Sequence, residues 1–238
     1  RPDIVHFHNI YHQLTPALIG VAKRFGCKTV LTAHDYKIVC PSYTMLRDGH
    51  VCDDCLTGSV SNAFRHRCQQ GDTFKSLLLS LEAYWQKFAQ NYAMLDCIIA
   101  PSEFMRQTLL RKLPRSRIDV IVNGIDASTT IPGDTAGDYF LYIGRLSHEK
   151  GVATLALAQQ KMQQSMPLKI VGDGPLGSDL RARFSGPEFL GYMRHGDALN
   201  ALIRGARAVI VPSEYYENCS MSVLEAMAFG RPVVGGNI

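Results

Sequence analysis

No stretch of this 238-residue sequence approaches the eighteen or so consecutive apolar residues that a membrane-spanning helix needs. It contains no run of lysines and arginines of the kind that marks nucleic-acid binding, and its net charge is a mild +4. The first residues, RPDIVHFHN, lack the charged and apolar regions of a signal peptide. We therefore expect a cytoplasmic enzyme with no nucleic-acid partner.

The composition, 46% hydrophobic and 19% charged, is typical of a globular protein with one large or two small domains. Neither end of the sequence resembles a natural terminus. It begins almost directly in a strand-like run and stops at Gly236-Asn237-Ile238, just after another. We expect a piece of a longer protein.

Strand-like and helical patterns alternate along the first half, which predicts parallel βαβ units. The expected elements are a buried strand over Ile4 to His8, a helix over Thr15 to Phe25, strands over Thr29 to Thr32 and Asp96 to Ala100, a helix over Glu103 to Lys112 capped by Ser102, and a strand over Ile118 to Val122. His34 then follows a strand's carboxyl end. Its alternative role is that of an ordinary structural histidine.

The segment Ala127 to Gly137 is rich in Thr, Gly and Asp and is the best linker candidate. A second alternating region follows, with strands over Asp138 to Ile143, Lys169 to Gly172, Glu188 to Leu190 and Val209 to Val211, and a helix over Val152 to Gln164. We predict an α/β fold of two Rossmann-like domains, residues 1–130 and 131–238.

Residues 36–71 interrupt the first domain with four cysteines, at positions Cys40, Cys52, Cys55 and Cys68. A Cys-x2-Cys pair flanked by two more cysteines suits tetrahedral zinc, and an iron–sulfur cluster is the other metal to consider. Four unrelated thiols or two disulfides remain alternatives. We predict a structural zinc clip on a loop insertion.

Apolar residues at three- and four-residue spacing run from Phe74 to Tyr92 and predict one long amphipathic helix. We expect this stripe to face the core of the domain in preference to a membrane surface.

Two cations stand five positions apart in Gly144-Arg145-Leu146-Ser147-His148-Glu149-Lys150-Gly151, between an expected strand and helix. In that position Arg145 can clasp a diphosphate with two parallel hydrogen bonds, and Lys150 can do so as a point charge. The alternative is a pair of solvated surface cations.

The stretch VIVPSEYYENCSMSVLEAMAFGRPVVG, residues 209–235, predicts strand, loop, helix, turn and strand. Ligands bind in the loops after the strands of an open parallel sheet, so the amides of Ser220, Met221 and Ser222 would face an anion. Glu217 and Glu225 could be solvated carboxylates or could border one pocket. The apolar neighbours of Glu225 imply that its carboxylate needs a partner.

The segment Gly172-Asp173-Gly174-Pro175-Leu176-Gly177 matches the dinucleotide fingerprint, and a nicotinamide-dependent oxidoreductase is the rival hypothesis. That fingerprint belongs on a domain's first strand and needs an acidic residue at the end of the next strand. Here it follows the second strand, and Glu188 stands at the beginning of the next one.

Glu217, seven residues, Glu225 and then AMAFGRPVV resemble the signature of the retaining glycosyltransferases of family 4, which have the GT-B architecture. The octet from Gly144 resembles that family's donor-phosphate element, and Val-Gly-Asp-Gly-Pro and Asn-Gly-Ile-Asp at 123–126 are also similar to family elements. The family's glycine-rich loop after its first strand and its closing helices are absent from this sequence, and the four-cysteine insertion is not a general family feature.

The resemblance implies a hexose-type transferase that uses a nucleotide-diphosphate sugar and a glycan or lipid-linked acceptor. It also implies peripheral association with the inner face of the membrane. It implies that Gly144, Arg145, Lys150, Tyr192, Met193, Ser220, Met221, Ser222 and Glu225 bind the donor. His34 and Glu217 would contact the transferred sugar, and no catalytic cofactor is implied. Besides the oxidoreductase, a nucleotide-sugar epimerase and a non-catalytic binding fragment remain alternatives.

Overall fold

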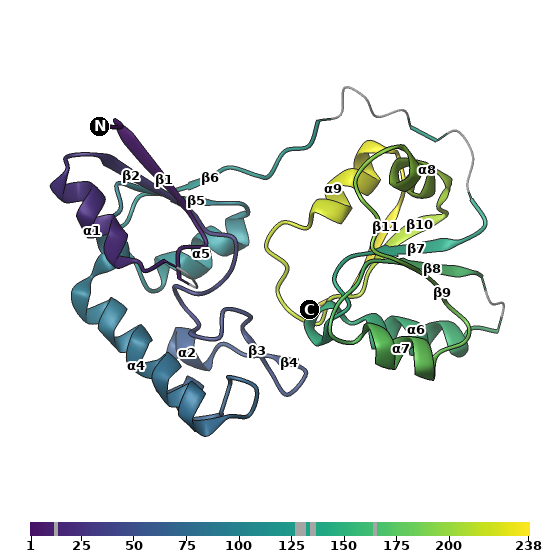
Figure 1. The fold of residues 1–238 in the computed structure, drawn as a ribbon, viewed down its shortest axis with the longest axis horizontal. Helices are drawn as coiled ribbons and strands as arrows, with labels where there is room; N and C mark the ends of the chain where they lie inside the picture. The colour runs from purple at the N-terminus through teal and green to yellow at the C-terminus, as the bar shows by residue number, and fades with distance from the viewer. Residues whose placement is uncertain (12–13, 127–131, 134–136, 164–165) are drawn as a thin grey trace. The chain divides into compact units, whose positions relative to one another are not determined.

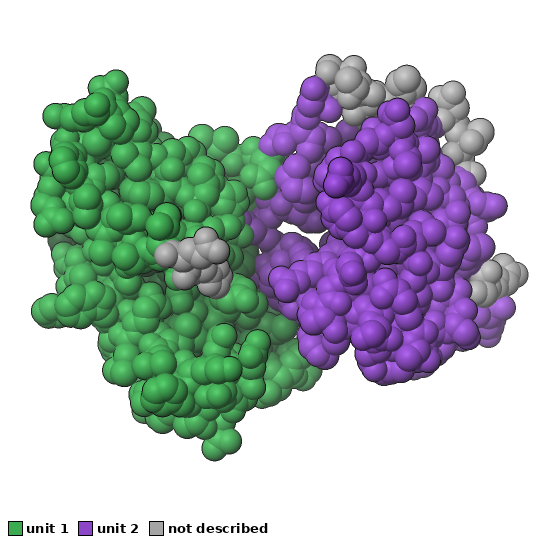
Figure 2. All heavy atoms as spheres, viewed as in Figure 1, with its two compact units in different colours: residues 1–123 green, residues 124–238 purple. Residues whose placement is uncertain are grey.

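The computed structural model describes residues 1–11, 14–126, 132–133, 137–163 and 166–238. The chain divides into two compact units, Arg1–Asn123 and Gly124–Ile238, which Figure 2 shows in green and purple. The boundary predicted at residues 130 and 131, and most of the predicted linker, lie outside the described residues.

Unit 1 is built on a parallel four-stranded sheet in the order β1-β2-β5-β6 (Figure 1). Its strands are β1 (Ile4–His8), β2 (Lys28–Thr32), β5 (Cys97–Ala100) and β6 (Ile118–Val120), and its connecting helices include α1 (Ala17–Arg24) and α5 (Glu103–Leu110). Ser102 caps α5 as predicted, because its Oγ accepts a hydrogen bond from the Met105 amide at 3.1 Å.

The prediction that β1 is a buried strand is wrong. Only Phe7 is buried in this strand, and Ile4 is 60% exposed. The reason is its place in the sheet: β1 pairs with β2 alone among the described strands and forms an edge. An apolar run predicts a strand, but it does not indicate whether other strands will flank it on both sides.

The cysteine-rich segment forms a small subdomain with little regular structure. It contains the hairpin of β3 (Leu46–Arg47) and β4 (His50–Val51), followed by the one-turn helices α2 (Asp54–Thr57) and α3 (Asn62–Arg65). Among the described residues, five of the seven non-glycine residues with positive φ lie in this subdomain. They are Tyr43, Met45, Asp48, Arg67 and Gln70.

The longest helix, α4 (Thr73–Ala89), is confirmed as a helix, but the prediction that its apolar stripe faces the core is wrong. The stripe residues that lie on α4 are exposed, and Phe88 near the end of the helix is 82% accessible. Tyr92, predicted as the last member of the stripe, lies beyond the end of α4 and is half-buried. Ser76, Ser80 and Gln86 are buried on the opposite face. Helical spacing identified the stripe, but the local polar contacts of this helix decide which face turns inward. The short 3₁₀ helix η1 (Asn91–Met94) follows.

Unit 2 has a parallel five-stranded sheet in the order β11-β10-β7-β8-β9. The strands are β7 (Phe140–Ile143), β8 (Leu168–Val171), β9 (Glu188–Gly191), β10 (Ala208–Val211) and β11 (Val233–Gly235). The helices are η2 (His148–Lys150), α6 (Val152–Gln160), α7 (Gly177–Arg183), α8 (Asp197–Gly205) and α9 (Met221–Ala228). The buried residues of unit 2 form two core clusters. One contains Leu141 and Val209, and the other contains Ile170 and Leu180. The predicted α/β class with parallel sheets is confirmed.

Candidate functional site

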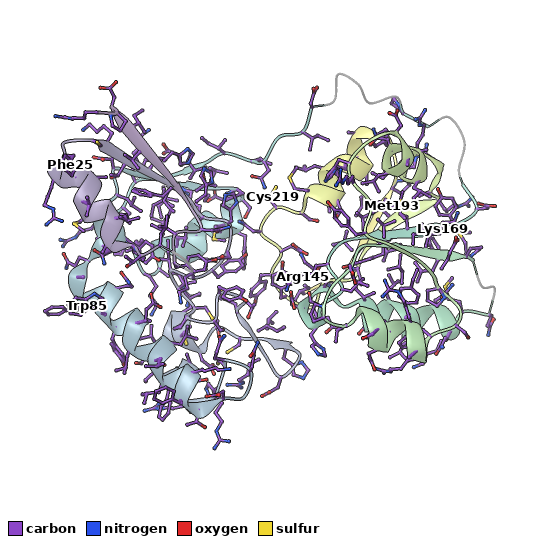
Figure 3. All side chains as sticks on the ribbon, viewed as in Figure 1. Phe25, Trp85, Arg145, Lys169, Met193 and Cys219 are labelled. Atoms are coloured by element: carbon purple, nitrogen blue, oxygen red, sulfur yellow. The ribbon has the colours of Figure 1, made fainter. Side chains whose placement is uncertain are left out.

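Most of the predicted donor-binding residues lie in loops at the carboxyl edge of the sheet of unit 2. All pairings in this sheet are parallel, so the loops that follow β7, β8, β9 and β10 leave at the same edge. These loops carry Arg145, Asp173, Met193 and Cys219 respectively, three of which Figure 3 labels. The fold therefore brings segments more than 70 positions apart in the sequence to one edge.

The loop after β7 presents Arg145 to solvent. The buried Tyr142 hydroxyl donates to the Arg145 carbonyl at 2.8 Å and so fixes the loop backbone. The Arg145 side chain is exposed, and within the described ranges its guanidinium has no hydrogen-bond or ion-pair partner. A cation held in this way at the sheet edge is available to an anionic ligand.

Lys150 is engaged by residues of the loop after β10. Its Nζ lies 2.7 Å from Glu217 Oε1 and donates to the Tyr215 hydroxyl at 2.9 Å. Ser213 Oγ also donates to Glu217 Oε1, at 2.5 Å. Burial by itself lowers the pKa of Lys150, but the Glu217 carboxylate and Tyr215 outweigh this effect, so that the pKa is raised. Lys150 therefore stays charged at neutral pH.

The backbone at Gly151 allows Lys150 to reach this loop. Gly151 has φ of +65°, and a Cβ at this position would collide with the Pro212 carbonyl at the start of the loop after β10. The glycine that ends the predicted phosphate element thus has a packing role as well as a conformational one.

Glu225 is mostly buried on α9, with 16% of its side chain exposed. Its Oε1 lies 3.5 Å from His195 Nδ1. Burial raises the pKa of Glu225, and His195 opposes this effect. The structure thus places the His195 ring beside the carboxylate for which a partner was expected. Sequence analysis missed His195. Its position just after Tyr192 and Met193, in the loop that follows β9, could have indicated that it belongs to the site.

The start of α9 lies where the sequence predicted it. Ser220 is the N-cap, and the helix begins at Met221. The amides of Met221 and Ser222 belong to the first turn, where no preceding turn supplies acceptors. The Ser220 and Ser222 hydroxyls lie 2.9 Å apart and are hydrogen-bonded to each other. Two hydroxyls and two amides therefore gather at the positive end of this helix.

The glycines of the dinucleotide-like segment pack against the loop after β7. A Cβ at Gly172 would collide with the Gly144 carbonyl, and one at Gly174 would lie 2.5 Å from the Leu146 carbonyl oxygen. The backbones are also bonded, since the Leu146 amide donates to the Asp173 carbonyl at 3.0 Å. Close packing of two loops therefore accounts for the first two glycines without a bound dinucleotide, and β9 begins with Glu188 as predicted.

Tyr192 and Met193 differ in their surroundings. Tyr192 is exposed, whereas Met193 packs partly against a core cluster of unit 2. An exposed aromatic ring after β9 is available to stack on a planar ligand. The role of both residues in binding the base stays a prediction.

His34, the predicted sugar contact in unit 1, follows the end of β2 and belongs to a group of histidines with His6 and His8 of β1. His34 Nε2 and His8 Nδ1 lie 2.7 Å apart, and the His6 and His8 rings lie 4.3 Å apart between centroids. Burial and then the neighbouring His8 and His6 lower the pKa of His34. His34 is therefore neutral at physiological pH.

Asp35, the next residue, was missed by sequence analysis. Burial raises its pKa to about 6, although the Lys37 amide donates to it at 2.9 Å. A carboxylate with a raised pKa beside a predicted site residue is a further candidate for function.

The four cysteines of the insertion carry free thiols, as do the other three in the chain. Cys40 and Cys55 are buried. Burial raises the pKa of Cys55 to about 12, and the charges of Cys40, Cys68 and Cys52 add to the effect. In the parts of the chain that the structure describes, no three His, Cys, Asp or Glu side chains are placed to hold a metal. The zinc site stays a prediction.

Two family models match the chain almost end to end. One, described as Glycosyltransferase Family 4, matches residues 1–129, and the other, described as Glycosyl transferases group 1, matches residues 137–238.

Several known proteins are similar to the chain. A glycogen synthase of Mycobacterium tuberculosis is 35% identical over 136 residues, which are 52% of this chain and 32% of the synthase. A Salmonella typhimurium lipopolysaccharide 1,2-N-acetylglucosaminetransferase is 27% identical over 58% of this chain and 43% of that protein.

Anabaena HepE in complex with UDP-glucose has a similar structure, with a TM-score of 0.61, 18% identity and coverage of 98% of this chain and 59% of HepE. The lipopolysaccharide outer core galactosyltransferase WaaB has a TM-score of 0.58, 20% identity and coverage of 98% of this chain and 56% of WaaB. The chain thus spans about a third to three fifths of these relatives, and the structures show that it shares their fold.

Proposed function

This chain belongs to glycosyltransferase family 4 and has the GT-B fold, and we propose that its protein transfers a sugar from a nucleotide-diphosphate donor to an acceptor with retention of configuration. The observation that carries the proposal is the set of cationic and amide groups at the carboxyl edge of unit 2. Arg145 is unpartnered among the described residues, Lys150 is charged, and α9 begins in the neighbouring loop.

These groups suit a leaving diphosphate. As the glycosidic bond breaks, negative charge develops on the departing phosphate, and donors that are already in place stabilise this charge. Arg145 offers two parallel hydrogen bonds, and Lys150 keeps one N–H beyond those directed at Glu217 and Tyr215. The amides of Met221 and Ser222 lie at the positive end of the α9 dipole, which favours a bound anion.

The two glutamates have different roles in this proposal. Glu225 accepts hydrogen bonds from the donor ribose, and its partly buried position supports a role in binding. Glu217 contacts the hydroxyls of the transferred sugar, with its carboxylate oriented by Lys150 and Ser213. Tyr192 and Met193 flank the base, and Gly144 leaves room for the Tyr142 hydroxyl, which a Cβ at this position would meet at 2.8 Å.

No dedicated base is assigned on the donor side. The proposed chemistry is a front-face displacement in which the leaving phosphate accepts the acceptor's proton. His34, whose pKa is lowered by burial and then by the neighbouring histidines, contacts the sugar as a hydrogen-bonding group.

We propose a uridine diphosphate sugar as the first donor to test, since HepE binds UDP and UDP-glucose. The proposed acceptor is a growing glycan or lipid-linked saccharide, in keeping with the lipopolysaccharide transferase among the relatives. The proposed location is the cytoplasm, with peripheral association at the inner face of the membrane.

Calorimetric titration with UDP, GDP, ADP and NAD, followed by donor-consumption assays with and without saccharide acceptors, tests the proposal. We expect one nucleoside diphosphate to bind and its sugar to be transferred only when an acceptor is present. Binding of NAD alone would support the oxidoreductase, and conversion of the donor without an acceptor would support an epimerase. If the full-length protein bound a nucleoside diphosphate tightly but transferred no sugar, the result would support a non-catalytic binding protein.

A further inference from the structure

Helix α4 exposes a row of large apolar residues and buries three polar residues, Ser76, Ser80 and Gln86. Large apolar side chains that are exposed along one face are Phe74, Leu77, Leu78, Leu81, Trp85 and Phe88. We call this set the α4 stripe. It extends over fourteen helical steps, or about 21 Å at 1.5 Å per residue. Figure 3 labels Trp85, the only tryptophan of the sequence, on the outer side of this helix.

Polar contacts on the inner face fix this orientation. Ser76 Oγ donates to the Asp72 carbonyl at 2.6 Å and accepts from the Gln69 amide at 3.0 Å. Ser80 Oγ donates to the Val60 carbonyl at 3.2 Å. Rotating the helix to bury the α4 stripe would leave these groups without partners, which is costly for buried polar atoms. The exposure of the stripe is therefore specified by the sequence.

Basic residues surround the α4 stripe. Lys75 and Lys87 are exposed on the helix itself. Lys112 donates a hydrogen bond to the Gly58 carbonyl at 3.1 Å, and burial and then the Lys87 charge lower the pKa of Lys112. The acidic residue within the helix is Glu82, and it is paired with Lys37 at 2.8 Å. Unit 1 contains 15 Lys and Arg against 10 Asp and Glu, whereas unit 2 contains 10 against 11.

We propose that the α4 stripe docks onto an anionic lipid bilayer, with α4 lying in the interface. A helix with a Trp, Phe and Leu face and flanking lysines is the kind that binds in the plane of a membrane and is attracted by anionic lipid. None of the described helices is long and apolar enough to cross a bilayer. A second copy of the chain would be a poorer partner, because symmetric pairing through α4 would bring the lysines of both copies together.

Trp85 makes the proposal directly measurable, because the 238-residue chain contains no other tryptophan. Its emission should shift to shorter wavelength when the chain is mixed with vesicles that contain phosphatidylglycerol, and brominated lipids should quench it. Vesicles of phosphatidylcholine alone should bind at least tenfold less. The assay needs neither donor nor acceptor, so its failure would leave the proposed transferase function in place.

Matched variants separate the stripe from general surface hydrophobicity. Leu78→Gln combined with Leu81→Gln should reduce vesicle partitioning at least tenfold, whereas Leu157→Gln, at an exposed leucine of unit 2, should leave it unchanged. Lys75→Gln and Lys87→Gln should each reduce binding about fivefold at low salt, since one basic residue near an anionic surface contributes about 1 kcal/mol. Circular dichroism confirms that each variant is folded.

Three results would overturn the proposal. They are absence of vesicle binding by the folded wild-type chain, equal binding to neutral and anionic vesicles, and a loss of binding by Leu157→Gln as large as that of the stripe variant. Dimers that dissociate on substitution of Leu78 and Leu81, together with no vesicle binding, would assign the stripe to a second copy of the chain.

Discussion

Lys150 and Glu217, separated by 67 positions in the sequence, meet at 2.7 Å with about a quarter of each side chain exposed. This ion pair joins the two loops to which the phosphate and sugar contacts are assigned. Lys150 is therefore a proposed phosphate ligand and also the residue that orients Glu217. A donor that binds here meets a carboxylate that is already held by Lys150, Ser213 and Tyr215.

Removal of Lys150 alone should have two effects that a double variant can separate. Lys150→Ala leaves Glu217 without its cation, so we expect a loss of about 1–3 kcal/mol in the free energy of unfolding and weaker diphosphate binding. Lys150→Met with Glu217→Gln removes both charges and should recover most of the stability, but not the diphosphate affinity. Chemical denaturation and calorimetry measure the two quantities. Recovery of affinity in the double variant would contradict a phosphate role for Lys150.

The same pair predicts a dependence of stability on alkaline pH. The folded pKa of Lys150 is raised, so the stability that its charge contributes is fully present below its unfolded pKa and is lost as the pH rises through the folded pKa. We expect the wild-type protein to lose more stability above about pH 10.4, the ordinary lysine value, than Lys150→Met with Glu217→Gln does. Parallel urea denaturation curves at pH 8 and at successive alkaline pH values measure the difference, and identical pH profiles would contradict the prediction.

Arg145 should act on phosphate alone, because its side chain has no partner among the described residues. Arg145→Ala should weaken nucleoside diphosphate binding roughly ten- to a hundredfold, as expected for charge-assisted hydrogen bonds of about 1.5–3 kcal/mol, and should barely affect the nucleoside. Arg183→Ala is the matched control, because Arg183 is an exposed arginine of unit 2 that pairs with Asp179. An equal loss for both ligands would point to general destabilisation of unit 2.

The sequence was sufficient to predict most of the elements, and it led to the carboxyl edge of the unit 2 sheet as the place of the proposed donor site. Strand and helix patterns placed β2, α5, β10 and α9 to within one or two residues, because local periodicity and capping determine them. The buried face of α4 was predicted wrongly, since periodicity does not indicate which face packs inward. The partners of Glu217 and Glu225 could not be predicted, because Lys150 and His195 reach them only through the arrangement of the sheet.

The four cysteines should bind one zinc ion. Their subdomain holds five non-glycine residues at positive φ, a conformation that costs of order 1–3 kcal/mol at each, and has only short strands and one-turn helices to offset this cost. A metal site would supply the missing stability. No three such ligands among the described residues are in place to hold a metal, so zinc binding requires the thiols to move closer together.

Metal analysis of protein purified without added zinc measures the stoichiometry. We expect about one zinc per chain, and Cys52→Ser should lose the metal and lower the melting temperature, whereas Cys97→Ser should keep the metal. Metal-free protein with four titratable thiols, or with disulfides, would show that the cluster has another role.

The last prediction separates the two glutamates, and it applies to the full-length protein. Burial raises the pKa of Glu225, so ionising this carboxyl costs stability as the pH rises through its folded pKa. Glu225→Gln should therefore leave the free protein as stable as the wild type, or more stable, near neutral pH. Its donor affinity should fall, because the charge-assisted contact to the ribose is lost.

Glu217→Gln should mainly reduce turnover, because a contact that strengthens as the glycosyl cation develops affects the rate more than ground-state binding. Calorimetry with donor and initial rates at saturating donor distinguish the two, with Glu188→Gln, at an exposed glutamate at the opposite end of β9, as the control. If both variants kept wild-type affinity and turnover, the two carboxylates would have no part in donor binding or transfer, and the roles assigned to the loop after β10 would have to be abandoned.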